Sequence, residues 1–598
     1  MTTDFYGDET TFGSVYDRRI LRRLWHYLQP YRWRVFVSVG LMVLIASLDA
    51  AGPLILRWAI DHQIREGQTD RLGALTLLFV GTLVVGFVLS YAQGMMMATV
   101  GQRVVLDIRL DIFRHLQRMS IAFFDRNPVG RLVTRVTNDV AVIEQVLTQG
   151  VVQILTNLLM VIVFLGVLLF LDWRLALLMY VFMPPLIWSV RLFALTQREA
   201  FTQQRIWLAR LNAYLNELIT GVAILQLFNR RRESMQRFDE RNAGLLEANK
   251  RSIFWYAVFE PTVVAFGAIT TGAILWYGGG RVVQTTLTLG TLVAFLQYMQ
   301  RFYWPLRELS QRYTTLQSAI ASAERVFTVL DSPEEVTDVE APRHLPTPVQ
   351  GRIEFRDVWF AYEPENWVLR GVSFTIEPGD RVAVVGATGA GKSTMMSLIT
   401  RFYDVQRGEI LVDGVPIREL PQRELRRHVG LMLQDPFIYT DSVTENIRLR
   451  DTSISEEQVQ RAATAVGASR FIDRMPEAYA SHLAERGANL STGQKQLIAL
   501  ARVAAFDPEI VLVMDEATAS IDPETEALIQ RGMEAMAQRR TAIVIAHRLN
   551  TIRSVERILV LHRGELVEEG THEELLALGG YYHRLYELQY RGAAPASG

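Results

Sequence analysis

Long apolar runs fill the first half of this 598-residue chain, and none of comparable length occurs in the second half. The runs cover residues 35–51, 75–92, 151–171, 175–190 and 254–277, and a weaker run covers residues 287–309. A helix needs about 20 apolar residues to cross the hydrocarbon core of a bilayer. We therefore expect six membrane-spanning helices, followed after about residue 336 by a soluble α/β part.

Two segments between these runs, residues 102–144 and 197–251, are too long for turns, contain few Gly or Pro and keep a helical spacing of apolar positions. We expect the spans to continue out of the membrane as helices that bend near residues 123–130 and 219–225, with a disordered loop as the alternative. The predicted domains are a cytosolic tail with an interfacial helix (1–33), a six-span transmembrane domain with two long cytoplasmic helical extensions (34–330), a linker (331–351), an α/β domain (352–588) and a C-terminal tail (589–598).

Arginine residues are concentrated on one side of the predicted spans. Segments after the second and fourth spans are rich in Arg, and a cluster precedes the first span: Arg18, Arg19, Arg22, Arg23, Arg32 and Arg34. Such a bias marks the cytoplasmic side of a membrane protein. We expect a multi-pass protein of the cell inner (cytoplasmic) membrane, with both termini and the α/β domain in the cytoplasm.

Overall charge and cysteine content exclude several kinds of function. The formal net charge is −1, so no nucleic-acid partner is expected. The chain contains no Cys, which excludes disulfides, thiolate metal sites and thiol catalysis.

A glycine-rich segment in the second half has the pattern of a phosphate-binding loop. It follows the apolar stretch 381–385 and opens a helical pattern, and its residues are Gly386, Ala387, Thr388, Gly389, Ala390, Gly391, Lys392, Ser393 and Thr394. Glycines let backbone N–H groups converge on an anion in front of the positive end of a helix. Lys392 can reach the terminal phosphates and the Ser393 hydroxyl can hold Mg²⁺. The segment predicts a nucleoside triphosphate site, and a Gly-rich turn is the alternative.

A second apolar stretch, residues 510–514, ends in the acidic pair Asp515 and Glu516. Ligands of α/β sheets bind at the carboxyl ends of the strands, so both acids are expected beside the phosphate loop. Asp515 suits Mg²⁺, directly or through water, and Glu516 is placed to polarise an attacking water.

The order of these motifs resembles that of the ATP-binding cassette (ABC) proteins. The segment 490–496, Leu-Ser-Thr-Gly-Gln-Lys-Gln, precedes the acidic strand by about one helix, and Ala546-His547-Arg548 follows another apolar stretch. The resemblance covers essentially the whole chain and is closest to exporter half-transporters of the bacterial multidrug-resistance type. It implies a six-span α-helical membrane domain of the type IV exporter kind, fused to a cytosolic α/β P-loop nucleotide-binding domain.

The resemblance implies a role for further residues around the nucleotide. Tyr362 matches the aromatic residue that stacks on adenine, and Gln434 matches the glutamine that touches Mg²⁺ and the lytic water. Ser491, Gly493 and Gln494 of the signature segment match the residues that cap the γ-phosphate bound by the opposite subunit. Asp522 matches the loop that communicates between the two sites, and His547 matches the histidine that contacts the γ-phosphate. The implied ligands are ATP and Mg²⁺, with Ser393, Gln434 and Asp515 as metal ligands.

One residue departs from the family pattern. The usual signature reads Leu-Ser-Gly-Gly-Gln, whereas Thr492 replaces its first Gly here. A β-branched residue is stiffer and bulkier than Gly, so this phosphate clamp is expected to close less well. In heterodimeric exporters that resemble this chain, one subunit combines an intact catalytic Glu with an altered signature, and its partner has the reverse. Because Glu516 and His547 are present here beside the altered signature, we expect a heterodimer with one consensus and one degenerate ATP site, in preference to a homodimer.

The leading functional hypothesis is ATP-driven efflux of amphiphilic drugs, lipids or peptides by alternating access. A lipid flippase is the alternative, and an ATP-gated channel or regulatory subunit is a weaker one, since Glu516 argues for hydrolysis. Three charged residues within or beside spans, Asp49, Arg57 and Arg301, either contact substrate or form inter-helix pairs. Met95–Met97 can offer a soft apolar surface, although core or lipid contact is the simpler role.

Overall fold

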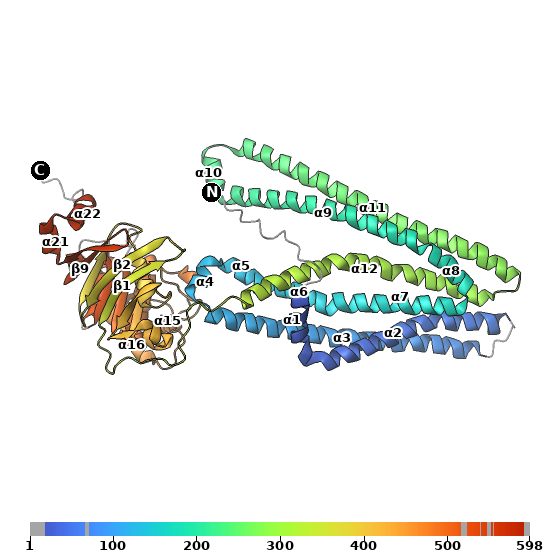
Figure 1. The fold of residues 1–598 in the computed structure, drawn as a ribbon, viewed down its shortest axis with the longest axis horizontal. Coiled ribbons are helices and arrows are strands. Elements are labelled where there is room, and N and C mark those ends of the chain that lie inside the picture. Colours follow the sequence, from blue (N-terminus) through green and yellow to red (C-terminus); the bar gives the residue numbers. More distant parts are fainter. Residues whose placement is uncertain are drawn as a thin grey trace. The chain divides into compact units, whose positions relative to one another are not determined.

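The computed structural model describes residues 18–65, 71–515, 523–538, 540–546, 552–553 and 555–590. The chain divides into two compact units. In Figure 1 the first is coloured from blue to green and the second from yellow to red, except that residues 118–128, coloured blue, belong to the second unit. The first unit comprises residues 1–117 and 129–332 and is helical where it is described. The second comprises residues 118–128 and 333–598 and holds both β-sheets. The predicted order of a helical membrane part followed by an α/β part is confirmed.

The first unit is built from long helices, most of them linked by short connections. The helices of the first half of the chain are α1 (Arg18–Leu28), α2 (Arg32–Trp58), α3 (Leu72–Arg118), α4 (Ile121–Arg126), α5 (Val129–Thr134), α6 (Val140–Gln145), α7 (Val151–Leu171), α8 (Trp173–Val181), α9 (Met183–Thr220), α10 (Val222–Leu227), α11 (Arg231–Val283) and α12 (Leu289–Leu330). Of these, α4 belongs to the second unit.

Five helical stretches among the described residues are long and apolar enough to cross a membrane, and they contain the five stronger apolar runs. The weaker run at 287–309 falls in α12, which has 42 residues but is not one of the five. Its apolar sequence is interrupted by Gln297, Gln300 and Arg301. A helix buried among other helices needs less apolar surface than one that faces lipid, and α12 packs against α2, α7 and α11.

The core of the helical unit lies around α12. Ala294, Phe295, Tyr298 and Phe302 recur on one face of this helix and are fully buried. The Tyr298 hydroxyl donates to the backbone carbonyl of Ala50 in α2. This face ties α12 to α2 and places the next residues of the helix, Gln300 and Arg301, at the edge of the core.

The N-terminal helix α1 packs inside the helical unit. Its amphipathic sequence buries Ile20. Tyr27 stacks on Phe327 of α12 with ring centroids 6.4 Å apart, and the Tyr31 hydroxyl, just after α1, donates to Asp107 of α3 over 2.9 Å. The predicted interfacial helix is therefore anchored to two of the long helices.

Helices continue through both long connections and bend where the sequence predicts. The first connection is interrupted by the short helix α4, between the end of α3 at Arg118 and the start of α5 at Val129. The second is interrupted at Gly221 and around residues 228–230, on either side of α10. α9 and α11 pack against each other along this hairpin (Figure 1). Met97 is buried in α3 whereas Met95 is 54% exposed, so the three Met residues do not form one surface.

Two sheets and their covering helices form the second unit. The smaller sheet is antiparallel in the order β2-β1-β4-β5, and the larger one has the order β10-β9-β3-β8-β7-β6. The strands are β1 (Ile353–Ala361), β2 (Trp367–Ile376), β3 (Arg381–Val385), β4 (Arg407–Val412), β5 (Val415–Pro416), β6 (Val429–Met432), β7 (Ile510–Asp515), β8 (Thr541–Ala546), β9 (Arg557–His562) and β10 (Glu565–Gly570). The helices are α13 (Lys392–Ile399), α14 (Gln422–His428), α15 (Val443–Arg448), α16 (Glu456–Ala465), α17 (Ser469–Ile472), α18 (Thr492–Phe506), α19 (Pro523–Ala537), α21 (His572–Leu578) and α22 (Tyr581–Tyr590).

Continuous apolar strands explain the larger sheet. Within β3, Val382, Ala383, Val384 and Val385 are all buried, as expected for a parallel strand covered on both faces. One apolar core lies between this sheet and the smaller one and includes Met395 and Met396 of α13. The helix that follows the glycine-rich loop is therefore held by packing on one side.

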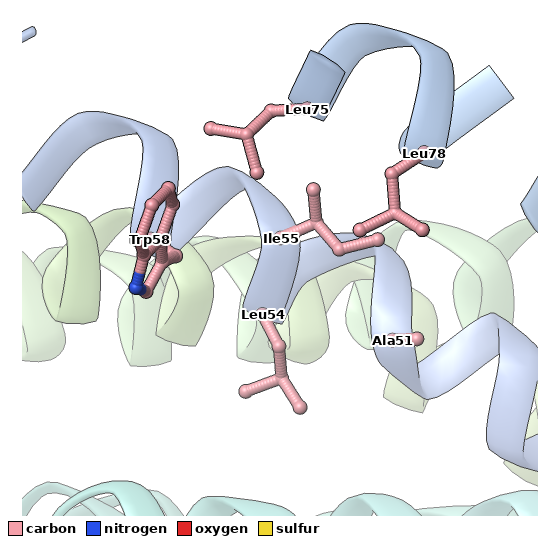
Figure 2. Close-up of a pocket in the computed structure, with 6 residues that line it drawn as sticks. All are labelled: Ala51, Leu54, Ile55, Trp58, Leu75 and Leu78. Atoms are coloured by element: carbon pink, nitrogen blue, oxygen red, sulfur yellow. The ribbon is translucent and has the colours of Figure 1, made fainter. Parts of the chain in front are cut away.

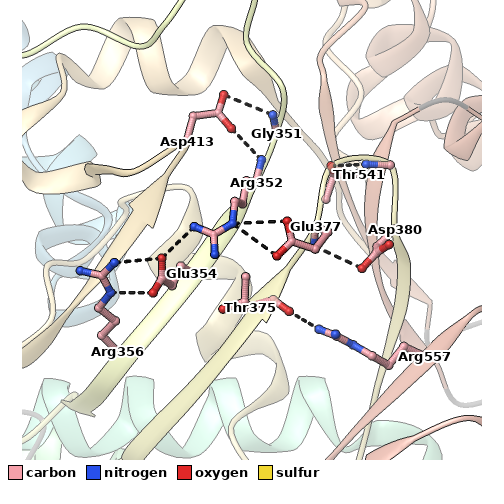
Figure 3. Close-up of polar contacts among 11 residues, drawn as sticks. Gly351, Arg352, Glu354, Arg356, Thr375, Glu377, Asp380, Asp413, Thr541 and Arg557 are labelled. Atoms are coloured by element: carbon pink, nitrogen blue, oxygen red, sulfur yellow. Dashed lines mark hydrogen bonds and ion pairs between the residues drawn. The ribbon is translucent and has the colours of Figure 1, made fainter.

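Polar contacts fasten the two sheets together at one end (Figure 3). The Asp413 carboxylate accepts from the backbone N–H groups of Gln350, Gly351 and Arg352 at 2.7–3.3 Å and fixes the start of β1. Arg557 of β9 donates to the carbonyl of Thr375 in β2. These bonds fix the relative positions of strands that flank the glycine-rich loop.

Candidate nucleotide-binding site

The glycine-rich loop has the backbone that a phosphate cradle requires. Gly389 and Gly391 adopt φ angles of +82° and +103°, values that residues with a side chain rarely adopt. A Cβ on Gly391 would lie 2.6 Å from Leu369 Cδ2, so this position also lacks room for a side chain. The loop curls directly into α13, whose N-terminal N–H groups and dipole favour an anion.

Lys392 lies inside this curl. Its side chain is 7% exposed, and its ammonium donates to the carbonyls of Gly386 at 2.7 Å and Ala387 at 3.1 Å. The positive charge is thus held against the backbone of the loop. Ser393 and Thr394 follow in the first turn of α13, with Ser393 exposed and Thr394 buried. In the loop itself, Ala387 and Thr388 are exposed and Ala390 is buried.

Parallel strands bring the remaining predicted residues to the same edge. β3 pairs with β8, β8 with β7, and β7 with β6, all in parallel. The loop follows β3, Gln434 follows β6 by two residues, and Asp515 is the last residue of β7. Ligands of parallel sheets bind beyond the carboxyl ends of the strands, where these segments meet.

The structure describes only part of the predicted acidic and histidine residues of this edge. For Asp515 the structure describes the backbone, paired with Ala546 of β8. Glu516, Asp522 and His547 lie outside the described residues. Their roles remain predictions from the sequence, supported by the strand ends that precede Glu516 and His547.

Tyr362 stands beside the loop, as the adenine-stacking prediction requires. The residue is 50% exposed, and its hydroxyl lies 3.1 Å from Thr394 Oγ1 in α13. Edge-on contacts with Phe360 and Tyr403, at centroid distances of 4.9 and 5.2 Å, hold the ring. An exposed face of a fixed aromatic ring can stack on a base.

Oxygen ligands suited to Mg²⁺ are available at the same edge. Ser393 presents a hydroxyl at the start of α13, and Gln434 presents a half-buried amide just beyond β6. Mg²⁺ commonly takes one or two protein oxygens and completes its octahedral shell with phosphate and water. The side chains of Ser393 and Gln434 fit that chemistry, and the carboxylate of Asp515 remains a ligand predicted from the sequence.

The signature segment forms the N-terminus of α18. Ser491 is the N-cap: its hydroxyl accepts from the Gln494 N–H at 3.3 Å, and the Gln494 side chain accepts from the Ser491 N–H at 2.9 Å. This capping box fixes the first turn. Ser491 and Thr492 are exposed, whereas Gly493 is buried. The helix therefore presents an ordered N-terminus to its surroundings.

Sequence reasoning missed the contacts around the segment 401–404, directly after α13. The Tyr403 hydroxyl donates to Asp125 of α4, and Arg126 of α4 pairs with Glu335. Burial, and then the hydrogen bond to Asp125, raise the pKa of Tyr403, so its hydroxyl stays a donor throughout the neutral range. The apolar bend at 123–130 located α4, but the sequence carries no signal for its partner, which lies 278 residues away.

Comparison with known proteins agrees with this geometry. Residues 35–306 match the family described as ABC transporter transmembrane region, and residues 369–519 match the family described as ABC transporter. The chain is 35% identical over 573 residues to the ATP-dependent lipid A-core flippase of Desulfotalea psychrophila, covering 96% of this chain and 100% of that protein. It is 36% identical to the fatty acid ABC transporter ATP-binding/permease protein of Mycobacterium bovis, covering 86% of this chain and 80% of that protein.

A solved structure is also similar to this chain. The structure of a bacterial Atm1-family ABC exporter with ATP bound matches with a TM-score of 0.75 and 27% identity, over 95% of this chain and 99% of that one. The chain therefore belongs to the ABC transporter family, as an exporter with a transmembrane region and an ATP-binding domain that couples ATP hydrolysis to transport.

Proposed function

We propose that the protein exports amphiphilic molecules across the cytoplasmic membrane, with the α/β domain and both termini in the cytoplasm. The observation that carries this proposal is the phosphate loop with its buried Lys392, joined in one chain to helices that can span a bilayer. The relatives named as a lipid A-core flippase and a fatty acid transporter support amphiphiles as cargo. The arginine-rich segments between spans support the orientation.

ATP is bound and hydrolysed at the edge formed by the loop, β6 and β7. The loop N–H groups and Lys392 hold the phosphates, and Tyr362 stacks on the base. Ser393, Gln434 and Asp515 would hold Mg²⁺, which neutralises charge on the phosphate oxygens when bound. Glu516 accepts a proton from the attacking water, and His547 contacts the γ-phosphate.

A second half-transporter completes each ATP site. The ordered N-terminus of α18, with Ser491, Gly493 and Gln494, caps the γ-phosphate bound by the opposite subunit, and Asp522 communicates between the two sites. Thr492 places a branched side chain on this turn. A heterodimer follows in which the ATP site that uses this signature is the weaker one.

Movement passes from the nucleotide to the membrane helices through α4. The segment that follows α13 holds α4 through Tyr403 and Asp125, and α4 lies in sequence between α3 and α5. A shift of α13 on nucleotide binding therefore acts on the connection between α3 and the helical stretch Val129–Leu171. ATP favours one of two conformations of the transporter because it binds that conformation more tightly than the other.

A lipid flippase is the second candidate, because the matched flippase spans 96% of this chain. It uses the same ATP cycle and differs in where the cargo is released. An ATP-gated channel gains no support from the residues described.

Transport assays in proteoliposomes test the proposal. The full-length protein, with any partner that co-purifies, is reconstituted with fluorescent phospholipid analogues and amphiphilic dyes, and ATP hydrolysis and cargo movement are measured together. Lys392→Ala should abolish both, whereas Lys250→Ala, at a lysine paired with Glu247 on the surface of α11, should not. Cargo movement by Lys392→Ala at the wild-type rate would overturn the proposal.

A further inference from the structure

An apolar groove lies between α2 and α3 in the helical unit. It has a volume of about 390 Å³, and Ile55 of α2 faces Leu75 and Leu78 of α3 within it (Figure 2). Its lining side chains carry no charge and, apart from the indole of Trp58, no polar group, so the groove specifies no particular ligand. The α/β unit holds a more specific arrangement, in which one arginine bridges two segments.

Arg502 stands on α18, the helix that begins at the signature segment, and its side chain is half-buried. Its Nε donates to the backbone carbonyl of Asn446 at 3.0 Å, and a terminal guanidinium nitrogen donates to the backbone carbonyl of Phe437 at 3.1 Å. A guanidinium suits such a bridge because its planar fork directs donors at two acceptors at once.

Both carbonyls belong to the part of the chain that follows β6 and carries Gln434. Phe437 lies three residues after Gln434, and Asn446 lies in α15. The fully buried Asn446 amide donates to the carbonyl of Tyr439 at 2.9 Å and accepts from the Tyr439 N–H at 2.8 Å. The segment is therefore held at Phe437 by Arg502, and at Tyr439 by a residue whose own carbonyl bonds to Arg502.

Apolar packing holds the same segment against the same helix. Ile438 is fully buried and belongs to one apolar core with Leu497 and Ile498 of α18. At its other end the segment starts from Met432, the last residue of β6. The chain between these two fixed points is short, so the position of Gln434 depends on both of them.

We propose that Arg502 is a positioning residue for the ATP site, which fastens the segment that carries Gln434 to α18. Gln434 is the expected Mg²⁺ ligand in this chain's own ATP site, whereas the N-terminus of α18 is assigned to the ATP bound by the opposite subunit. Arg502 thus joins parts of one chain that serve two ATP sites. The proposal rests on the proposed function and adds to it a residue that acts through Gln434.

Nucleotide binding with and without Mg²⁺ tests this role apart from hydrolysis. The full-length protein, with its co-purified partner in detergent, is titrated with the non-hydrolysable analogue AMP-PNP against a fluorescent nucleotide, in MgCl₂ or in EDTA. The readout is the ratio of the two dissociation constants, which does not depend on the fraction of folded protein. Arg502→Gln should reduce the gain in affinity on adding Mg²⁺ by about fivefold, comparable to the loss of one hydrogen bond, and leave binding in EDTA unchanged.

Two further variants accompany Arg502→Gln. Arg502→Lys should recover part of the gain, because an ammonium can bond one carbonyl but lacks the fork that reaches both. If Arg502→Gln does not fold, Arg502→Lys carries the test, since its gain should lie below that of the wild type. Arg531→Gln, at an exposed arginine of α19 that bonds to the carbonyl of Ala527 in its own helix, is the matched control and should equal the wild type.

Hydrogen exchange measures how firmly the segment is held, whatever the role of Gln434. Amides of residues 433–442 should exchange several-fold faster in Arg502→Gln than in the wild type, and Arg531→Gln should leave them unchanged. Unchanged exchange of this segment in Arg502→Gln would overturn the proposal. An equal loss of affinity in MgCl₂ and in EDTA would also overturn it, because that result indicates general damage to the site.

A double-variant cycle with Gln434→Ala separates this inference from the proposed function. If Gln434 holds Mg²⁺, Gln434→Ala removes the gain in affinity and Arg502→Gln adds little to that loss. Independent losses would contradict the positioning role, because Arg502 would then act without Gln434. An unchanged gain in Gln434→Ala would contradict the metal ligand assigned in the proposed function, and the exchange measurement tests the bonds of Arg502 without it.

Discussion

The guanidinium of Arg401 donates a hydrogen bond of 2.9 Å to the backbone carbonyl of Thr337, which fastens the linker to the second residue after α13. Arg401 is 1% exposed and also donates to the carbonyl of Leu420 at 2.8 Å and to Asp404 at 3.1 Å. The linker is therefore packed against the α/β unit at this point.

Replacing Arg401 with Met should destabilise the α/β unit by about 3–5 kcal/mol, because buried carbonyls and Asp404 lose their partner. For a domain of this size the loss corresponds to roughly 6–15 °C in melting temperature. Thermal unfolding of the full-length protein in detergent measures it. Arg356→Gln, at an exposed arginine that pairs with Glu354 and Glu409, is the control and should shift the melting temperature by less than about 2 °C. Equal shifts in the two variants would contradict the role given to Arg401.

Loss of the Tyr403 hydroxyl should weaken coupling more than hydrolysis. Tyr403→Phe removes the bond to Asp125 of α4 but keeps the ring contacts with Phe360 and Tyr362. We expect near-normal basal ATP hydrolysis and several-fold slower transport. Asp125→Asn should have a similar effect, and the double variant should be no worse than either single one. Additive losses would show that the two residues act separately.

Glu516→Gln should retain ATP and slow its hydrolysis by about 10²–10⁴-fold, because the amide cannot accept the proton of the attacking water. Retention of radiolabelled ATP and release of phosphate are measured on the same sample. Glu524→Gln, an exposed acid in the first turn of α19, is the matched control and should hydrolyse ATP normally. Full hydrolysis in Glu516→Gln would remove this residue from its role.

Thr492→Gly should raise ATP hydrolysis several-fold if the branched side chain hinders the phosphate clamp. The capping box of Ser491 and Gln494 does not involve the Thr492 side chain, so the helix start should survive the change. Hydrolysis is compared in wild type, Thr492→Gly and Thr492→Ala with the co-purified partner. Identical rates in all three would argue against a degenerate site.

Acid should weaken the C-terminal part of the α/β unit through His572. Burial, and then the charge of Arg553, lower the pKa of this imidazole, which lies 2.7 Å from the Tyr582 hydroxyl through Nδ1. Because the pKa is lower in the folded than in the unfolded state, the stabilisation is complete above the ordinary value of about 6.5 and is lost as pH falls below it. Melting temperatures between pH 7.5 and 5.5 should fall more steeply in wild type than in His572→Gln. Parallel curves would contradict this assignment.

Sequence patterns predicted the long helices and the glycine-rich loop because runs of neighbouring residues determine both features. Five apolar runs predicted five long helices, and the glycine spacing predicted the curl at Gly389 and Gly391. The central place of α12 was not predicted, because Gln297, Gln300 and Arg301 interrupt its apolar run. A helix that is surrounded by other helices does not need the long apolar run that marks a lipid-facing span. The contacts of Arg401 and Tyr403 join residues 64 and 278 positions apart, a separation that no local pattern encodes.

The membership of α4 in the α/β unit changes where this chain can be divided. Phe123 of α4 is 8% exposed within the described residues, and Asp125 and Arg126 bond to residues that follow position 332. A fragment that begins at the linker would lack this helix and both of these polar contacts. In an isolated ATP-binding fragment, Tyr403 and Glu335 would lack these partners, so such a fragment would report on an incomplete domain.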